Sequence, residues 1–344
     1  MRIRDQAAFP YARFLESSLV SLRLALQPEL RRITPGLARR GDRIAIYHAY
    51  QPGGLKPSTW DTFAHLVDKG YSLAVVSHAP LTEADRARLR ETAFAILERP
   101  NAGYDFGGYQ DAIQTLILGH ALPLRLLVMN DSVWFPLGAD CDLLERLEAA
   151  GHDVCAPVYY LHRKAHLCHA QSYMVLYSER AVASQAFRRF WSVYRAASNR
   201  TWTIRFGEMR MSEILRRGGL SVGGLTTAHA IAPSEIGWFL DWQQRLRRSG
   251  VIEQGPRVDG VFRGYILSNH PRILLGSRRL GLLKKDRGDI YGIQRDFLLR
   301  SDEVADLRAG LSPAVATEIA QHDLRPETGR HLDAVPSGNL VPSQ

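Results

Sequence analysis

Residues 93–117 read A-F-A-I-L-E-R-P-N-A-G-Y-D-F-G-G-Y-Q-D-A-I-Q-T-L-I, and this stretch indicates the fold class most clearly. The apolar run at 93–97 has the composition and length of a buried strand. Apolar residues with helical spacing follow at 113, 116 and 117. Between them, a turn with three glycines carries Asp105 where a helix should begin. The stretch predicts a strand, a glycine-rich turn and a helix in succession.

The same alternation continues on both sides of this unit. Apolar segments typical of strands lie at 43–50, 71–77 and 124–130. Helical patterns lie between them at 57–69 and 81–91. Strands that alternate with helices in this way indicate an α/β protein with a Rossmann-like, mostly parallel sheet. Ligands of such sheets bind at the carboxyl ends of the strands.

Changes in composition divide the chain into four regions. We expect an Arg-rich helical lead-in over 1–40 and a Rossmann-like half over 41–160. A second half of the same domain follows over 161–300. Over 301–344 we expect a helix and then a disordered tail, because hydrophobic content falls from about residue 310 and residues 325–344 are rich in Pro, Gly, Ser and Asn.

The bulk composition is that of a soluble globular protein. The 344 residues are 45% hydrophobic, and no apolar stretch reaches the roughly 18 residues of a membrane span. The start of the chain lacks the apolar core of a signal peptide, and three cysteines are few and odd in number. We therefore expect a cytoplasmic protein.

The charge balance is basic. The formal net charge is +9, which fits an anionic membrane surface or an anionic substrate. Neither zinc-finger spacing nor an RNA-recognition signature occurs in the sequence, so we expect no nucleic-acid partner.

Three acidic residues are candidates for chemistry, and each has two interpretations. Asp105 either caps the following helix or accepts hydrogen bonds from ligand hydroxyl groups, while the glycine backbone approaches a phosphate. Asp131, in N-D-S at a strand end, either caps a turn or binds a divalent cation. Glu208 either favours a helix start or acts as general base for a hydroxyl nucleophile.

A weaker candidate is the run H-x-x-x-H-L-C-H over residues 162–169. On one helix, its three histidines would share a face, as ligands of a zinc ion would. A continuous helix is not expected so close to a strand, so a polar loop beside the site is the favoured interpretation.

A series of sequence blocks occurs in the order typical of one bacterial family. The two most specific are R-P-N-A-G-Y-D-F-G-G-Y-Q-D-A-I at 99–113 and L-L-V-M-N-D-S-V-W-F-P-L at 126–137. The later blocks are H-A-Q-S-Y-M-V-L-Y-S at 169–178, A-F-R-R-F-W at 186–191, G-E-M-R-M-S at 207–212, N-H-P at 269–271 and L-L-K-K-D at 282–286. Over roughly residues 43–290, the chain resembles the rhamnan synthesis protein F family of bacterial polysaccharide glycosyltransferases.

The resemblance implies a nucleotide-sugar fold of the GT-A type. It implies transfer of a sugar, rhamnose or another hexose, from a nucleotide-diphosphate donor to a cell-surface polysaccharide or lipopolysaccharide. The half over 41–160 would bind the donor and the half over 161–300 the acceptor. The expected acceptor is lipid-linked, so the basic surface would hold the enzyme peripherally on the anionic inner membrane.

The resemblance also places the site. The turn at 101–109 is similar to the N-x-G-F-x-G-x-N turn that lies beside the donor in rhamnosyl- and other family-2-like transferases. We expect donor contacts from the turn, the strand ends and the last block: His48, Asn101, Gly103, Asp105, Gly107, Asn130 and either Lys284 or Lys285. Asp131 falls where such enzymes carry D-x-D, and it would bind Mg²⁺ or Mn²⁺ on the diphosphate, although only one carboxylate is present. Glu208 would take the proton of the acceptor hydroxyl.

Two other functions stay open at this point. A non-catalytic sugar- or nucleotide-binding component of a polysaccharide synthesis complex would bind the donor without turnover, in keeping with the single carboxylate at Asp131. Another Rossmann-type transferase, such as one that uses S-adenosylmethionine, also places an acidic residue at a strand end. The ligand that raises the melting temperature distinguishes these functions, because a ligand stabilises the native state that binds it.

Overall fold

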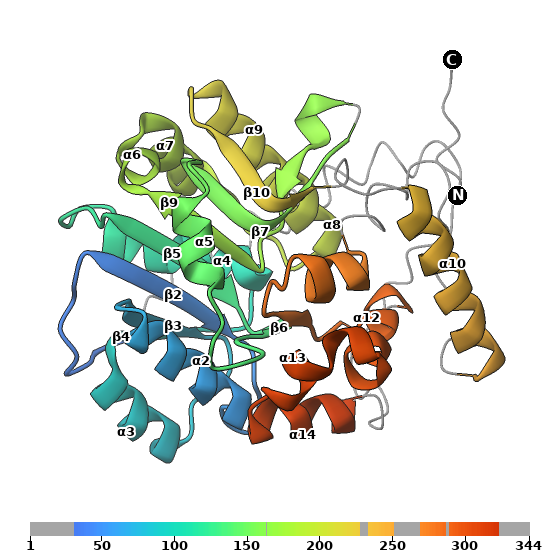
Figure 1. Ribbon diagram of the computed structural model, residues 1–344. Coiled ribbons are helices and arrows are strands. Elements are labelled where there is room, and N and C mark those ends of the chain that lie inside the picture. The colour runs from blue at the N-terminus through green and yellow to red at the C-terminus, as the bar shows by residue number, and fades with distance from the viewer. Residues whose placement is uncertain (1–30, 163, 228–232, 251–268, 287–288, 323–344) are drawn as a thin grey trace, which may run out of the picture.

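A computed structural model describes residues 31–162, 164–227, 233–250, 269–286 and 289–322. Helices cover both faces of a central sheet, which gives three layers (Figure 1). The strands occur in the spatial order β1 (Arg32–Pro35), β4 (Ala93–Glu98), β3 (Ser72–Ser77), β2 (Arg43–Ala49), β5 (Arg125–Asn130), β9 (Met174–Ser178), β7 (Val154–Tyr160) and β10 (Val222–Thr227), with β8 (His169–Ala170) paired to β7.

The sheet is mostly parallel. Strands β4, β3, β2 and β5 are parallel neighbours, and so are β7 and β10. Strand β9 runs antiparallel between β5 and β7, and β1 and β8 are also antiparallel to their partners. The predicted α/β class with a mostly parallel sheet is therefore confirmed, and the carboxyl ends of β2 to β5 share one edge.

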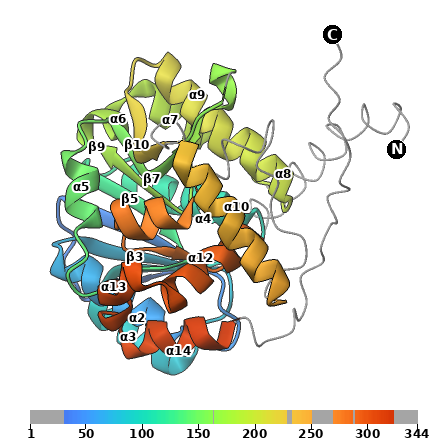
Figure 2. The ribbon, with the colours of Figure 1, turned by 45° about the vertical axis from the view of Figure 1, so that its right-hand side comes forward.

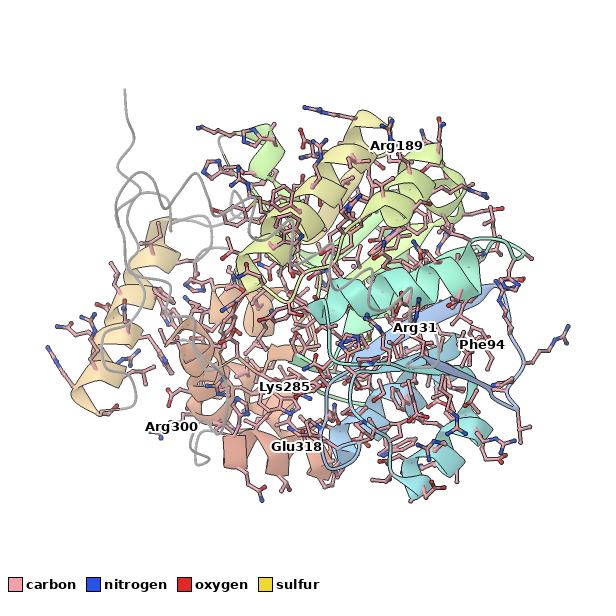
Figure 3. All side chains as sticks on the ribbon, turned by 180° about the vertical axis from the view of Figure 1, so that it is seen from behind. Arg31, Phe94, Arg189, Lys285, Arg300 and Glu318 are labelled. Carbon is pink, nitrogen blue, oxygen red and sulfur yellow. The ribbon has the colours of Figure 1, made fainter. Side chains whose placement is uncertain are left out.

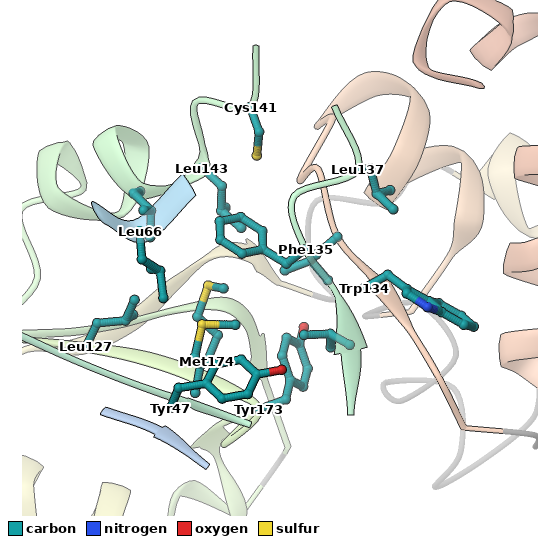
Figure 4. Close-up of a cluster of buried hydrophobic side chains, with 14 of the residues drawn as sticks. Tyr47, Leu66, Leu127, Trp134, Phe135, Leu137, Cys141, Leu143, Tyr173 and Met174 are labelled. Carbon is teal, nitrogen blue, oxygen red and sulfur yellow. The ribbon is translucent and has the colours of Figure 1, made fainter. Parts of the chain in front are cut away.

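Two hydrophobic cores lie on opposite faces of the sheet, because successive side chains of a strand point to opposite sides. In β2, Ala45 and Tyr47 belong to one core, and Ile44 and Ile46 belong to the other. The first core is covered by α2 (Pro57–Asp68), α3 (Glu83–Thr92), α5 (Leu143–Ala149), α12 (Asp289–Arg300) and α14 (Pro313–His322). Figure 4 shows part of this core, where Phe135 packs among aliphatic side chains. The second core is covered by α4 (Tyr104–Ala112), α6 (Glu179–Ala183), α7 (Gln185–Val193) and α9 (Arg210–Arg217).

The start of the described chain differs from the expected helical lead-in. Residues 32–35 form β1, an edge strand that pairs antiparallel with β4. Ile33 and Thr34 are β-branched and favour a strand, and a proline such as Pro35 is tolerated at a sheet edge. Residues 1–30 of the predicted lead-in lie outside the described residues.

Two later strands, β7 and β10, were not apparent in the sequence. Pro157 interrupts the strand pattern of β7, and Gly223 and Gly224 interrupt that of β10. A β-carbon on Gly224 would lie 2.8 Å from the backbone nitrogen of Tyr159, so the glycine permits close approach of the two strands. Both halves of the predicted domain thus contribute to one sheet.

The C-terminal elements gather on one side of the sheet (Figures 1 and 2). They are α10 (Pro233–Arg248), the π-helical segment Arg272–Ser277, β11 (Leu283–Lys284), α12, α13 (Ala305–Ala309) and α14. Strand β11 pairs antiparallel with β6 (Val133–Trp134), which follows β5 directly. This pairing brings Leu283 and Lys284 to the carboxyl edge of the sheet. No described helix is long and apolar enough to cross a bilayer. The predicted tail at 325–344 lies outside the described residues.

Candidate active site

The predicted acidic and basic residues meet at the carboxyl edge of the sheet. Asn130 is the last residue of β5, and Asp131 follows it. Asp105 lies in the first turn of α4, and Glu208 lies in the π-helical segment Thr203–Met209. Lys284 pairs with Val133 through β11 and β6, just beyond Asp131.

A serine joins two of the carboxylates. Asp105 Oδ1 accepts a hydrogen bond of 2.9 Å from the backbone N–H of Phe106, and its Oδ2 accepts one of 2.8 Å from Asn130 Nδ2. The Ser172 hydroxyl donates to Glu208 Oε1 and lies 3.4 Å from Asp105 Oδ2. Asp105 and Glu208 therefore share a neighbour that can orient both.

Burial shifts the pKa values of Asp105 and of the nearby Lys284. Burial, with a further contribution from nearby Glu208, raises the pKa of Asp105 to about 6. Burial lowers the pKa of Lys284, against the opposing effect of Glu208, Asp286 and Asp105. His169 Nε2 lies 3.5 Å from Glu208 Oε2. Titratable groups perturbed in this way are typical of functional sites.

Asp131 belongs to a second group of charges. Its Oδ2 accepts hydrogen bonds from the backbone N–H of Tyr50 at 2.9 Å and from Gln51 Nε2 at 3.2 Å. Burial raises the pKa of Asp131, and Lys285 is the main influence that opposes this rise. Burial lowers the pKa of Lys285 to about 8, although Asp131 and Glu318 favour its charged form. The carboxylate of Asp131 thus anchors the chain after β2 and faces an ammonium group.

This environment does not fit a metal ion at Asp131. One carboxylate oxygen already accepts two N–H donors, and the cationic groups that act on Asp131 are Lys285 and Lys56. Mg²⁺ in proteins is usually held by one or two carboxylates together with substrate phosphates, and at Asp131 such an ion would share the carboxylate with two N–H donors and lie close to Lys285. Across the described ranges, no group of three or more His, Cys, Asp or Glu side chains is arranged to hold a metal.

The run at 162–169 is a loop, as favoured above. Among its described residues, only 165–167 are helical, as one 3₁₀ turn, and His169 begins β8, so the histidines do not share a helix face. The Cys168 thiol lies 3.2 Å from both the backbone nitrogen and the carbonyl oxygen of His162.

Close packing accounts for two glycines of the turn. Gly103 has a φ of +80°, and a β-carbon there would lie 2.5 Å from that of Ala196. A β-carbon on Gly107 would lie 2.7 Å from the carbonyl oxygen of Ala102. The N–H of Gly103 donates to Ser198 Oγ, and the N–H of Gly107 donates to the carbonyl of Gly103. The protein itself therefore occupies the space beside both glycines and uses their N–H groups.

His48 lies beneath α4 and is only 5% exposed. A β-carbon on Gly108 would lie 2.5 Å from His48 Cδ2, so α4 approaches the sheet closely at this point. The ring of His48 packs edge-on against His78, with centroids 4.1 Å apart, and neither nitrogen of His48 has a hydrogen-bond partner among the residues that the structure describes. Burial, with a smaller contribution from Arg99, lowers the pKa of His48 to about 3. His48 is thus neutral near pH 7 and faces the helix.

Several residues of the site were not predicted from the sequence. Ser172 and His169 lie in the block at 169–178, which could have pointed to them. Glu318 comes from α14 and accepts hydrogen bonds from Ser58 and from Trp134 Nε1, yet the sequence around it carries no signal. Figure 3 shows Lys285 and Glu318 in the same region, in agreement with their electrostatic interaction.

Sequence comparison decides the family. The uncharacterized protein y4gN of Sinorhizobium fredii (strain NBRC 101917 / NGR234) is 36% identical over 307 residues, which are 80% of this chain and 79% of that protein. The family model described as rhamnan synthesis protein F matches residues 73–227, which include Asp105, Asp131 and Glu208. The chain belongs to the rhamnan synthesis protein F family. The resemblance found in the sequence blocks is therefore confirmed.

Solved structures of two sugar transferases are similar in part. The mannosyltransferase PcManGT from Pyrobaculum calidifontis, in complex with GDP-Man and Mn²⁺, is 11% identical, with 92% of this chain and 90% of that chain covered and a TM-score of 0.35. The galactosyltransferase LgtC, in complex with donor and acceptor sugar analogs, is 10% identical, with 78% and 96% covered and a TM-score of 0.34.

Proposed function

We propose that the protein is a glycosyltransferase that moves a sugar from a nucleotide-diphosphate donor to a hydroxyl group of a cell-surface polysaccharide or lipopolysaccharide. Membership of the rhamnan synthesis protein F family supports this class of enzyme. The observation that carries the proposal is the pair Asp105 and Glu208, joined through Ser172 at the carboxyl edge of the sheet. Small molecules bind at this edge in open α/β sheets.

Glu208 is the general base of the proposed reaction. Its carboxylate takes the proton of the acceptor hydroxyl as the acceptor oxygen attacks the sugar. Ser172 donates to one of its oxygens and His169 lies beside the other, so both orient the carboxylate. No step is assigned to Mg²⁺ or Mn²⁺, because the groups around Asp131 do not fit a cation.

The donor lies over the edge formed by Asn101, Asp105 and Asn130 in this proposal. Asp105 and Asn130 are already hydrogen-bonded to each other, which fixes both side chains for hydroxyl groups of the donor. The transferred sugar is rhamnose or another hexose. For Gly103, Gly107 and His48, the proposed part in donor binding is indirect, since they set the position of α4.

Exposed aromatic side chains flank the two carboxylates. Tyr104 precedes Asp105, is 46% exposed and has a φ of +50°. A left-handed conformation costs a residue with a side chain about 1–3 kcal/mol, and such strain is concentrated at functional sites. Phe206 is 37% exposed, lies two residues before Glu208, and packs on Trp202 with centroids 4.2 Å apart. We assign these rings to contacts with sugar rings.

The acceptor is lipid-linked in this proposal, and the protein works in the cytoplasm at the inner membrane. The last turns of α10 present the exposed side chains Arg245, Arg247 and Arg248, which suit an anionic lipid surface.

The test is a thermal-shift panel of UDP-, GDP- and dTDP-sugars, followed by measurement of nucleoside diphosphate release with a lipid-linked glycan extract. Stabilisation by one nucleotide family, with release that depends on the extract, supports the transferase. Stabilisation by a nucleotide sugar without release favours the binding component, and stabilisation by S-adenosylmethionine alone contradicts the proposal.

A further inference from the structure

Two consecutive lysines reach the site, Lys284 at the end of β11 and Lys285 directly after it. The backbone N–H of Lys285 donates to the carbonyl of Ser132, which keeps this residue next to the end of β5. Lys284 interacts with Glu208 and Asp105, and Lys285 interacts with Asp131 and Glu318. The two ammonium groups therefore act on different carboxylates of the site.

Aromatic faces hold both ammonium groups. Lys284 Nζ lies 4.7 Å from the centroid of the Tyr173 ring, and Lys285 Nζ lies 5.5 Å from that of the Trp134 ring. A cation over a ring is attracted by the ring and spends no hydrogen-bond donor on it. Within the described residues, neither ammonium group donates a hydrogen bond or forms an ion pair within 4.0 Å. Both keep their N–H donors for an anion.

The carboxylates of the site, in contrast, are already occupied by donors. Asp131 accepts from two N–H groups, and Asp105 accepts from Phe106 and Asn130. Glu208 accepts from Ser172. A divalent cation would have to displace these donors and lie near a lysine. The site is thus arranged to supply positive charge through ammonium groups.

We propose that Lys284 and Lys285 bind the donor diphosphate directly and that donor binding requires no divalent cation. This rests on the proposed function. In the transfer, the bond between the sugar carbon and the diphosphate oxygen breaks with its electron pair, and the acceptor oxygen forms the new bond. The acceptor proton goes to Glu208, and the two ammonium groups neutralise the charge that develops on the leaving diphosphate.

The test measures the affinity for UDP, GDP and dTDP by calorimetry, with Mn²⁺ and with EDTA. We expect one of them to bind with the same Kd in both conditions. Lys284→Met and Lys285→Met each weaken this binding by about 10-fold or more, since each removes a charge-assisted contact. Lys285→Arg keeps the charge and stays within about threefold of wild type.

Lys69→Met is the matched control. Lys69 follows α2, pairs with Glu145 and lies away from the carboxyl edge, so its variant keeps the wild-type Kd. Circular dichroism and the melting temperature without ligand show whether each variant is folded. Binding that appears only with Mn²⁺, or folded lysine variants that bind like wild type, overturns the inference and leaves the proposed transferase intact. Failure of all three nucleotides to bind overturns the proposed function and the inference with it.

Discussion

Helix α4 approaches the sheet so closely at Gly108 that Gly108→Ala should destabilise the fold. Gly108→Ala places a β-carbon 2.5 Å from His48 Cδ2, 3.0 Å from His78 Nε2 and 3.2 Å from Val76 Cγ1. Carbon atoms in contact normally lie about 3.5–4.0 Å apart, so the helix or the rings must move by about 1 Å. Both rings are buried and pack edge-on against each other, with centroids 4.1 Å apart.

Two opposing free-energy changes decide the outcome. Overpacking of a core costs about 1–3 kcal/mol, and alanine is favoured over glycine in a helix by about 1 kcal/mol. Since the neighbours are rings held by buried strands, we expect the upper part of the range. The free energy of unfolding should fall by about 1–2 kcal/mol, measured by urea unfolding at pH 7.

Gly237→Ala is the control for this substitution. Gly237 lies in α10, and a β-carbon there would meet no atom within 4 Å. This variant should gain about 0.5–1 kcal/mol from helix propensity alone. The double variant Gly108→Ala with His48→Ala should lose less than the sum of its single variants, because the added methyl group enters the space of the ring. Gly108→Ala at wild-type stability or above it would refute the packing argument.

Three further predictions concern charge. Between pH 3 and 6.5 the unfolded state binds more protons at His48 than the folded state, so the free energy of unfolding falls as pH falls. His48→Asn should make the slope of the unfolding free energy between pH 4 and 6 shallower by up to about 1.4 kcal/mol per pH unit. An unchanged slope in urea titrations would count against a neutral, buried His48. Asp105 acts with the opposite sign, because its raised pKa of about 6 lets the folded state bind more protons between about pH 4 and 6. Asp105→Asn should therefore steepen the slope of the unfolding free energy against pH. A shallower slope would contradict the raised pKa of Asp105. Replacing Arg245, Arg247 and Arg248 by Gln should weaken binding to anionic vesicles, measured by sedimentation, by about 1 kcal/mol per arginine. Neutral vesicles should bind neither protein. Equal sedimentation of the triple variant and wild type would show that α10 does not contact the membrane.

Local sequence patterns predicted the elements that are regular and early in the chain. The alternation around residues 43–130 gave the parallel strands and the helix after the glycine turn, because apolar periodicity and chain order fix a βα unit. The same patterns missed β7 and β10, where a proline and two glycines mask the strand. At Gly224, close approach of the neighbouring strand backbone accounts for the glycine.

The candidate site was predictable only in part. Asp105, Asp131 and Glu208 could be proposed because a carboxylate at a strand or helix end is visible in sequence. The role of Gly103 could not, since its nearest neighbour, Ala196, lies far along the chain. Nor could the sequence show that β11 carries Lys284 to β6, with Lys285 directly after it, because a two-residue strand has no pattern.

In the proposed transfer, Glu208 acts as base beside a bound nucleotide sugar. Glu208→Gln tests this role, because the variant keeps the shape of the side chain and removes its basicity. We expect an unchanged Kd for the nucleoside diphosphate that stabilises the wild type, and release from its nucleotide sugar reduced by about 100-fold or more. Wild-type release by a folded Glu208→Gln protein would show that Glu208 is not the base.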